Sequence, residues 1–156
     1  MKQRELQIVR HLRTNCRETL TKLSKKTGVP ISTLFDKLNE YRSSVILRNT
    51  CLIDYTKLGY DLRVQLLVKA GKDRDKFEAF LVDHLHVNTV FRINNGYDYL
   101  VEAIFQNMKE FTDFVSAMER HAVKDFKEFY VLQDLRREAF LTSDTHVALL
   151  ATPNGG

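Results

Sequence analysis

Apolar residues recur at helical spacing three times near the start of the chain. This spacing predicts helices over residues 4–13 and 19–26 and a third helix that begins at Pro30. Thr19 is suited to cap the second helix, and Gly28 is suited to end it, because glycine adopts a left-handed backbone without strain. Pro30 fits the first turn of a helix, where its missing N–H would have had no partner. Three short helices in this order predict a helix–turn–helix.

The third helix carries two faces of different character. Its apolar residues fall at positions 31, 34, 35, 38 and 41, a stripe that we expect to pack on the first two helices. Positions 32, 33, 36, 37 and 40 are then expected to face outward. A helix–turn–helix places the N-terminal part of such a helix in the major groove of DNA, where the small Ser32 and Thr33 allow a close approach. Lys37 is expected to reach a base edge or a phosphate, and an ordinary amphipathic helix is the alternative.

The segment after this helix changes to a β-like pattern. "RSSVILRNTCLID", residues 42–54, predicts a small wing or a connecting ribbon, with Arg48 exposed toward a phosphate. "DYTKLGYD", residues 54–61, carries turn residues and marks the expected boundary between two modules.

The following eighty or so residues contain one pattern twice. Residues 60–70 alternate apolar and polar side chains and predict a strand, residues 73–85 predict a helix, and residues 87–93 return to a strand. Residues 97–105, 108–121 and 123–135 repeat this order. Strand–helix–strand, twice, predicts a four-stranded antiparallel sheet covered by two helices, which is the ferredoxin-like βαββαβ arrangement of the α+β class.

Two helices cover only one face of such a sheet. We expect the other face to present apolar residues, namely Leu67, Val90, Leu100 or Tyr99, and Val131. Exposed apolar sheet surface is typical of an interface, so dimerisation through the sheets is predicted. A two-fold symmetric dimer suits two-fold symmetric DNA sites.

Charge is distributed unevenly along the chain. Residues 1–54 hold 11 Lys and Arg against 5 Asp and Glu, whereas the whole chain has a net charge of +4. A basic first module favours a polyanionic partner. The N-terminal residues carry charges throughout, which is not the pattern of a signal peptide, and no apolar run is long enough for a membrane span. We therefore expect a cytoplasmic protein in which Cys16 and Cys51 are free thiols, with a disulfide as the alternative.

Motifs for metal binding and catalysis are weak. The five histidines are scattered, and the His84-x-His86 pair has no Cys or carboxylate cluster at metal-ligand spacing. No nucleophilic triad context and no glycine-rich phosphate loop is visible. We expect no enzyme activity, no metal and no cofactor.

The order of these elements resembles the Lrp/AsnC (feast/famine) family of archaeal and bacterial transcription regulators, over roughly residues 4–138. "KLSKKTGVPISTLFDKL", residues 22–38, looks like the helix–turn–helix signature of that family. "LIDYTKLGYDLRVQLLVKA", residues 52–70, is similar to its linker and first strand, and "NNGYDYLV", residues 94–101, resembles its effector-loop motif. Asp36 stands where the family usually has a basic residue. Asn95 stands at the usual glycine position, and Asn-Gly readily makes a type I′ turn.

The resemblance implies three regions. They are a (winged) helix–turn–helix DNA-binding domain with its linker over residues 1–54, a RAM/ACT-like βαββαβ dimerisation and effector domain over residues 55–140, and a C-terminal tail over residues 141–156. It implies double-stranded DNA as partner, assembly as dimers, tetramers or octamers, and an amino-acid effector. In the tail, residues 145–151 are expected to add an edge strand or cover a neighbouring subunit, and residues 152–156 to be loose.

Two sets of candidate site residues follow. The candidate DNA-binding residues are Arg17, Lys22, Ser32, Thr33, Lys37, Arg42 and Arg48. The candidate effector-binding residues are Asn95, Gly96, Tyr97 and Asp98. A plain hairpin turn with no ligand is the alternative for the second set.

Two other functions compete with DNA-dependent regulation. The first is a sirohaem decarboxylase, because some proteins that look like this family have that activity; Arg92, His84, His86 and His121 would then surround a tetrapyrrole. The second is a sensor or adaptor that has lost DNA binding, which Asp36 favours.

Overall fold

A computed structural model describes residues 2–151 of the chain, so the loose end expected at residues 152–156 lies outside these residues. The chain divides into two compact units. Unit 1 combines the described parts of residues 1–52 and 136–156, and unit 2 is Ile53–Leu135. Within the described residues, no helix is long and apolar enough to cross a membrane.

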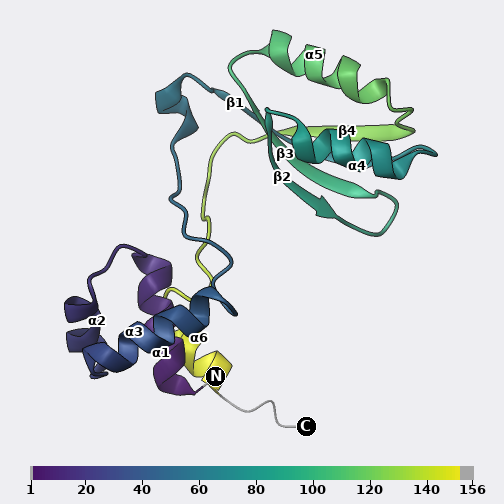
Figure 1. Cartoon of the computed structure of the whole chain (residues 1–156). Coiled ribbons are helices and arrows are strands. Elements are labelled where there is room, and N and C mark those ends of the chain that lie inside the picture. The colour runs from purple at the N-terminus through teal and green to yellow at the C-terminus, as the bar shows by residue number, and fades with distance from the viewer. Residues whose placement is uncertain (1, 152–156) are drawn as a thin grey trace. The chain divides into compact units, whose positions relative to one another are not determined.

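Unit 1 is a bundle of four helices, which Figure 1 shows gathered together: α1 (Gln3–Thr14), α2 (Leu20–Thr27), α3 (Ile31–Arg42) and α6 (Asp144–Ala151). The three N-terminal helices confirm the sequence prediction. The hydroxyl of Thr19 accepts a 3.3 Å hydrogen bond from the backbone N–H of Lys22 and caps α2. Gly28 follows α2 with φ of +68°, the left-handed conformation that its position requires.

The core of unit 1 lies between the first three helices. It consists of Ile8, Val9, Leu23, Leu34 and Tyr41, with Leu141 from the C-terminal segment packed against it. Five buried side chains form a small core, and contacts with the C-terminal segment therefore add to its stability.

Helix α6 packs on α1, over a hundred residues away in sequence. Val147 of α6 is buried, and Asp144 forms an ion pair with Arg10 at 3.5 Å and accepts a 3.0 Å hydrogen bond from Gln7. The edge strand expected over residues 145–151 is wrong, because this segment is helical and lies against a helix.

Of the two forms expected for residues 42–54, a small wing or a connecting ribbon, the wing is wrong. Arg42 ends α3, and residues 43–54 form neither helix nor strand. Val45, Leu47 and Leu52 are exposed. The β-like pattern has no strand beside it within the described residues, and a strand needs a partner for its backbone hydrogen bonds. A short 3₁₀ helix, η1 (Tyr55–Leu58), and Gly59 then begin unit 2.

Unit 2 is a four-stranded antiparallel sheet with two helices on one face (Figure 1). Its elements in chain order are β1 (Leu62–Lys69), α4 (Arg74–Asp83), β2 (Val87–Arg92), β3 (Tyr99–Phe105), α5 (Met108–Glu119) and β4 (Asp125–Tyr130). The strand order is β2-β3-β1-β4, with β1 and β3 in the centre. The predicted βαββαβ arrangement is confirmed.

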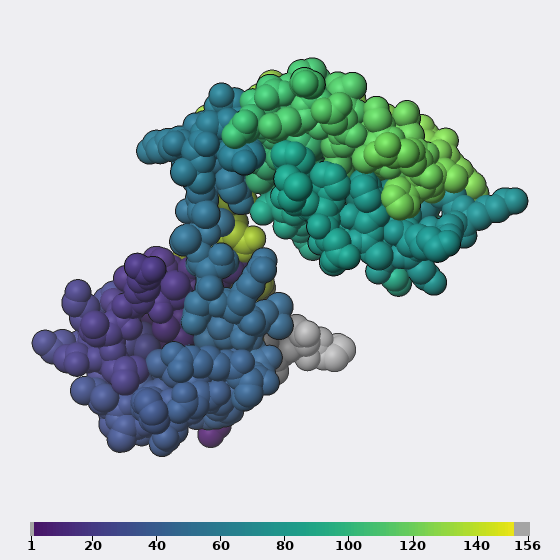
Figure 2. All heavy atoms as spheres, turned by 45° about the horizontal axis from the view of Figure 1, so that its top comes forward, coloured from purple at the N-terminus to yellow at the C-terminus, as the bar shows by residue number. Residues whose placement is uncertain are grey.

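The helix-covered face holds the core of unit 2. Val64, Leu66 and Val68 of β1 are buried beneath the helices, and Phe80 of α4 stacks on Phe114 of α5 with ring centroids 6.0 Å apart. The space-filling view shows the teal residues of α4 beside the green residues of α5 (Figure 2). Alternating residues of β1 point to the other face, which no described helix of unit 2 covers.

The register corrects the expected composition of that open face. Leu67 pairs with Leu100, and both lie half-buried on the open side, as predicted. Tyr99 pairs with Val68 and is buried in the core, and Val90 pairs with the buried Val101. Tyr99 and Val90 therefore belong to the helix-covered face, because side chains alternate along a strand and one step of register moves a residue to the other side.

Candidate functional site

The outer surface of α3 differs from the predicted stripe. Leu34 and Tyr41 are buried, as expected, and fix the side of the helix that faces the core. Ile31 and Phe35 were expected to pack inward, but they are 47% and 57% exposed. The part of α3 that packs against the core is therefore narrower than the predicted stripe, since only Leu34 and Tyr41 are buried and Leu38 is partly buried against them.

The first candidate residues on α3, Ser32 and Thr33, are exposed at its N-terminal end. Asn39 is exposed two turns further along, and it is not among the candidates selected from the sequence. Its seven-residue spacing from Ser32, which places both on one side of a helix, could have identified it as outward-facing.

Lys37 lies differently from the prediction. Its ammonium is 2.9 Å from a carboxylate oxygen of Glu40 and 2.9 Å from one of Glu5 on α1. Hydrogen bonds to these two carboxylates raise the pKa of Lys37 above its usual value, and the bond to Lys37 holds the pKa of Glu5 below its own. Lys37 thus ties α3 to α1 within unit 1 and is not a free cation.

The other candidate cations of unit 1 are available to an anion. Arg17, Lys22, Arg42 and Arg48 are all exposed. Within the described part of the chain none of these four forms an ion pair, and the one contact of Arg42 with a side chain is a long 3.5 Å bond to the amide oxygen of Asn39. Lys26, by contrast, is paired with Glu18. Exposed, unpaired cations of this kind are suited to neutralise phosphates.

The open face of the unit 2 sheet combines apolar and polar rows. Phe91 and Phe129 are 57% and 51% exposed and flank the half-buried pair Leu67 and Leu100. Four apolar side chains thus lie together on a sheet face that no described helix of unit 2 covers.

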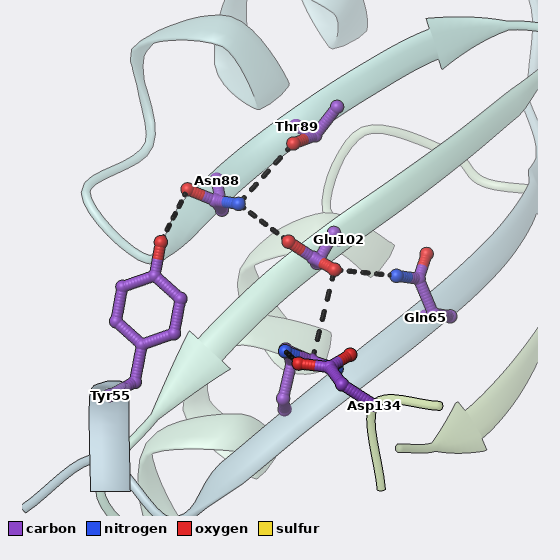
Figure 3. Close-up of polar contacts among 7 residues, drawn as sticks. Tyr55, Gln65, Asn88, Thr89, Glu102 and Asp134 are labelled. Atoms are coloured by element: carbon purple, nitrogen blue, oxygen red, sulfur yellow. Dashed lines mark hydrogen bonds and ion pairs between the residues drawn. The ribbon is translucent and has the colours of Figure 1, made fainter. Parts of the chain in front are cut away.

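A polar network crosses the same face (Figure 3). Glu102 is its centre, accepting hydrogen bonds from Gln65 at 2.8 Å and from Asn88 at 2.5 Å. The Asn88 amide in turn accepts one from the Tyr55 hydroxyl at 3.3 Å, and Arg63 is paired with Asp134. The side chain of Glu102 is only 13% exposed. The carboxylate is therefore satisfied within the chain, and this face can be covered without leaving that charge unpaired.

The candidate effector loop is held to the rest of unit 2. Asn95 and Gly96 have φ of +68° and +99°, the two positive values that a type I′ turn requires, so the predicted turn is confirmed. The Asp98 carboxylate accepts a 2.9 Å hydrogen bond from the backbone N–H of Ala70 and pairs with Arg74 at 2.8 Å. The Tyr97 hydroxyl donates to Asp125 at 3.1 Å.

Some of the histidines that the sirohaem decarboxylase hypothesis requires lie close together. His84 lies 5.7 Å from His86 between ring centroids, and His121 lies 4.5 Å from Phe80 in the same aromatic cluster. Burial lowers the pKa of His84, and the neighbouring His86 lowers it further. Arg92 does not join them, because its guanidinium is held by Glu78 at 2.7 Å. Among residues 2–151, no group of three or more His, Cys, Asp or Glu is placed to hold a metal ion.

Comparison with known proteins identifies relatives of this chain. Residues 62–140 match the family model of the Lrp/AsnC ligand binding domain. The HTH-type transcriptional regulator FL11 of Pyrococcus horikoshii is 30% identical over 111 residues, which are 69% of this chain and 73% of that protein. An uncharacterized HTH-type transcriptional regulator of Pyrococcus furiosus is 26% identical over 62% of this chain, and the match spans 66% of its own length.

A solved structure has the same fold. It is a transcriptional regulator of Neisseria meningitidis in complex with L-methionine, and it superimposes with a TM-score of 0.82 at 23% identity. The superposition covers 88% of this chain and 93% of that one. The fold assigned from the sequence, a helix–turn–helix followed by a ferredoxin-like domain, is thereby confirmed.

Proposed function

Because this chain belongs to the Lrp/AsnC family, we propose that it is a DNA-binding transcription regulator that acts as a dimer or larger assembly and responds to a small molecule such as an amino acid. The observation that supports this function most directly is the outer surface of unit 1. There the N-terminal end of α3 is exposed, and Arg17 and Lys22 of the same unit are exposed cations with no ion pair among residues 2–151. The major groove of a DNA duplex would receive α3, and the phosphates of the DNA backbone would contact the cations.

DNA binding is tested with duplexes selected from a random library. The chain should bind a subset of the duplexes in the library. The double variant R17A/K22A should bind a duplex from this subset at least tenfold more weakly than the wild type does. The control is K109A, which removes an exposed lysine of α5 in unit 2 and should bind as the wild type does. Equal affinity of R17A/K22A and the wild type would contradict the placement of the DNA on unit 1.

Self-association is proposed to use the open sheet face. Phe91 and Phe129 are the largest exposed apolar side chains on that face, and a second copy would remove them from water. In sedimentation experiments F91E/F129E should be a monomer at concentrations where the wild type is a dimer. V82E changes an equally exposed apolar residue on α4, at 65%, and should remain a dimer. A dimeric F91E/F129E would place the interface elsewhere.

The effector is proposed to be an amino acid bound near residues 95–98. The relative from Neisseria meningitidis is described in complex with L-methionine, and this chain carries the corresponding kind of domain. Isothermal titration with each of the twenty amino acids would identify the ligand. D98N should lose binding, because Asp98 fixes the loop to Ala70 and Arg74.

A non-enzymatic role in the cytoplasm completes the proposal. The relatives are transcriptional regulators, which disfavours the sirohaem decarboxylase. Addition of sirohaem or haem should leave the absorbance spectrum of the tetrapyrrole unchanged. The non-DNA-binding adaptor is the remaining alternative, and it is excluded if the wild type retains selected duplexes.

A further inference from the structure

Helix α3 has a defined outward side. Leu34, at 0% exposed, and Tyr41, at 2%, mark the direction of the core. At about 100° per residue, Ser32 and Asp36 lie on the opposite side of the helix, with Asn39 next to them, where it also lines a hollow formed with residues of α1 and α2. The exposed Ile31 and Phe35 lie along one flank of these three residues, and Lys37 lies along the other.

The side chains along this outward side include no free arginine or lysine. Lys37 is the one basic residue in positions 31–41, and it is held by Glu5 and Glu40. Arg42 is the last residue of the helix, and it belongs to the exposed cations described above as suited to neutralise phosphates. Guanine is most often read by a bidentate arginine or lysine on O6 and N7. Positions 31–41 of α3 therefore present no free basic side chain for this contact with guanine.

The exposed groups match the edge of an adenine–thymine pair. An apolar side chain such as Phe makes contact with the 5-methyl group of thymine, and the amide of Asn forms two hydrogen bonds with adenine N6 and N7. Phe35 offers an exposed ring, and Asn39 offers an amide whose nitrogen donates no hydrogen bond within the described residues. The two residues are one helical turn apart on adjoining parts of the surface, about 6 Å in rise, so they reach neighbouring base pairs.

We propose that Phe35 and Asn39 determine the operator sequence, Phe35 by contact with a thymine methyl group and Asn39 by hydrogen bonds to adenine. Each half-site then contains adjacent or near-adjacent A·T pairs beneath α3. This inference rests on the proposed DNA-binding function and assigns its sequence specificity to residues other than Thr33 and Lys37.

The test uses modified duplexes. A duplex selected by the wild type from a random library is resynthesised with deoxyuridine in place of thymidine, one position at a time, which removes only the 5-methyl group. The wild type should lose roughly fourfold in affinity at one position in each half-site, the factor expected for one methyl group left exposed to water. F35A should bind the unmodified duplex more weakly and should show no loss at that position.

The adenine contact is tested in the same way. Replacing one adenine by 7-deazaadenine removes the N7 acceptor, and the wild type should lose about fivefold or more at one position in each half-site. N39A should be insensitive there. T33A is the matched control on α3, and it should keep both sensitivities. F35L, which retains an apolar side chain, should keep the sensitivity to deoxyuridine.

Each outcome has one meaning. If the wild type binds selected duplexes but loses no more affinity on the deoxyuridine and 7-deazaadenine substitutions than F35A and N39A do, the assignment of these residues is overturned and the DNA-binding function is not. A selected duplex with guanine at the base pairs that α3 contacts would also overturn the assignment of Phe35 and Asn39. A wild type that retains no duplex from the library overturns the DNA-binding function itself and this inference with it.

Discussion

Removing two methyl groups from the C-terminal helix should destabilise the N-terminal helices. Val147 of α6 is 1% exposed, and V147A removes carbon atoms that now pack against α1. At about 0.8 kcal/mol for each buried methyl or methylene group, and with a further cost for the cavity, the change should lower the free energy of unfolding of unit 1 by about 2 kcal/mol. For a unit of this size the midpoint of thermal unfolding should fall by roughly 8–16 °C.

Hydrogen exchange measured peptide by peptide is the appropriate assay. Peptides from α1 and α2 should lose protection in V147A, whereas peptides from β1 and β3 in unit 2 should not change, since the two units have separate cores. T145A, an exposed position on the same helix, is the control. Unchanged protection of α1 in V147A would refute the claim that α6 is an integral part of unit 1.

Two further changes test unit 2. In G71A, a Cβ at residue 71 would lie 2.0 Å from the backbone oxygen of Ala122, so the loops that precede α4 and β4 must separate. Urea denaturation should show that the free energy of unfolding falls by about 1–3 kcal/mol. G96A is a useful comparison, because residue 96 has open space around it but a positive φ. An unchanged stability would mean that this close approach does not persist in solution. Burial depresses the pKa of His84 in the folded chain, so the unfolded state takes up the proton more readily and stability should fall as the pH drops below about 6.5. H84F should show a smaller fall between pH 7 and 5 than the wild type, and an identical fall in both would exclude His84 as the cause.

The regular elements could be predicted from the sequence because their signals are local. The alternation in β1 and the apolar spacing in α5 identify a strand and a helix without knowledge of their neighbours. Thr19, Gly28 and the Asn95-Gly96 pair act within one turn of the backbone, and each adopts the predicted conformation. The repetition of strand–helix–strand then restricts the topology to few arrangements.

Predictions from the sequence failed where the conformation or contacts of a residue depend on a segment that is distant in the chain. Residues 145–151 show no decisive period, and their helix is stabilised by α1, which the local sequence cannot reveal. Residues 43–54 have a strand-like composition but no neighbouring strand. The ion pair of Lys37 with Glu5 was not predicted for the same reason, because Glu5 lies on another helix.

The exposure of Phe35 has a similar origin. A stripe at positions 31, 34, 35, 38 and 41 is the same in a sequence whether two helices cover it fully or in part. Only the packed unit shows that the side near Leu34 and Tyr41 is covered and the flank at Phe35 is not. The periodicity alone therefore placed Phe35 in the core, and it assigned Asn39 to neither side of the helix.

The salt dependence of DNA binding tests the central claim most directly. Each phosphate neutralised by the protein contributes about −0.9 to the slope of log affinity against log salt concentration. With Arg17, Lys22, Arg42 and Arg48 all exposed, the slope for a selected duplex should be about −3 or steeper for each copy of the chain. R17A should reduce its magnitude by about 1. A slope near zero, with or without these cations, would contradict the proposal that the basic surface of unit 1 lies against DNA.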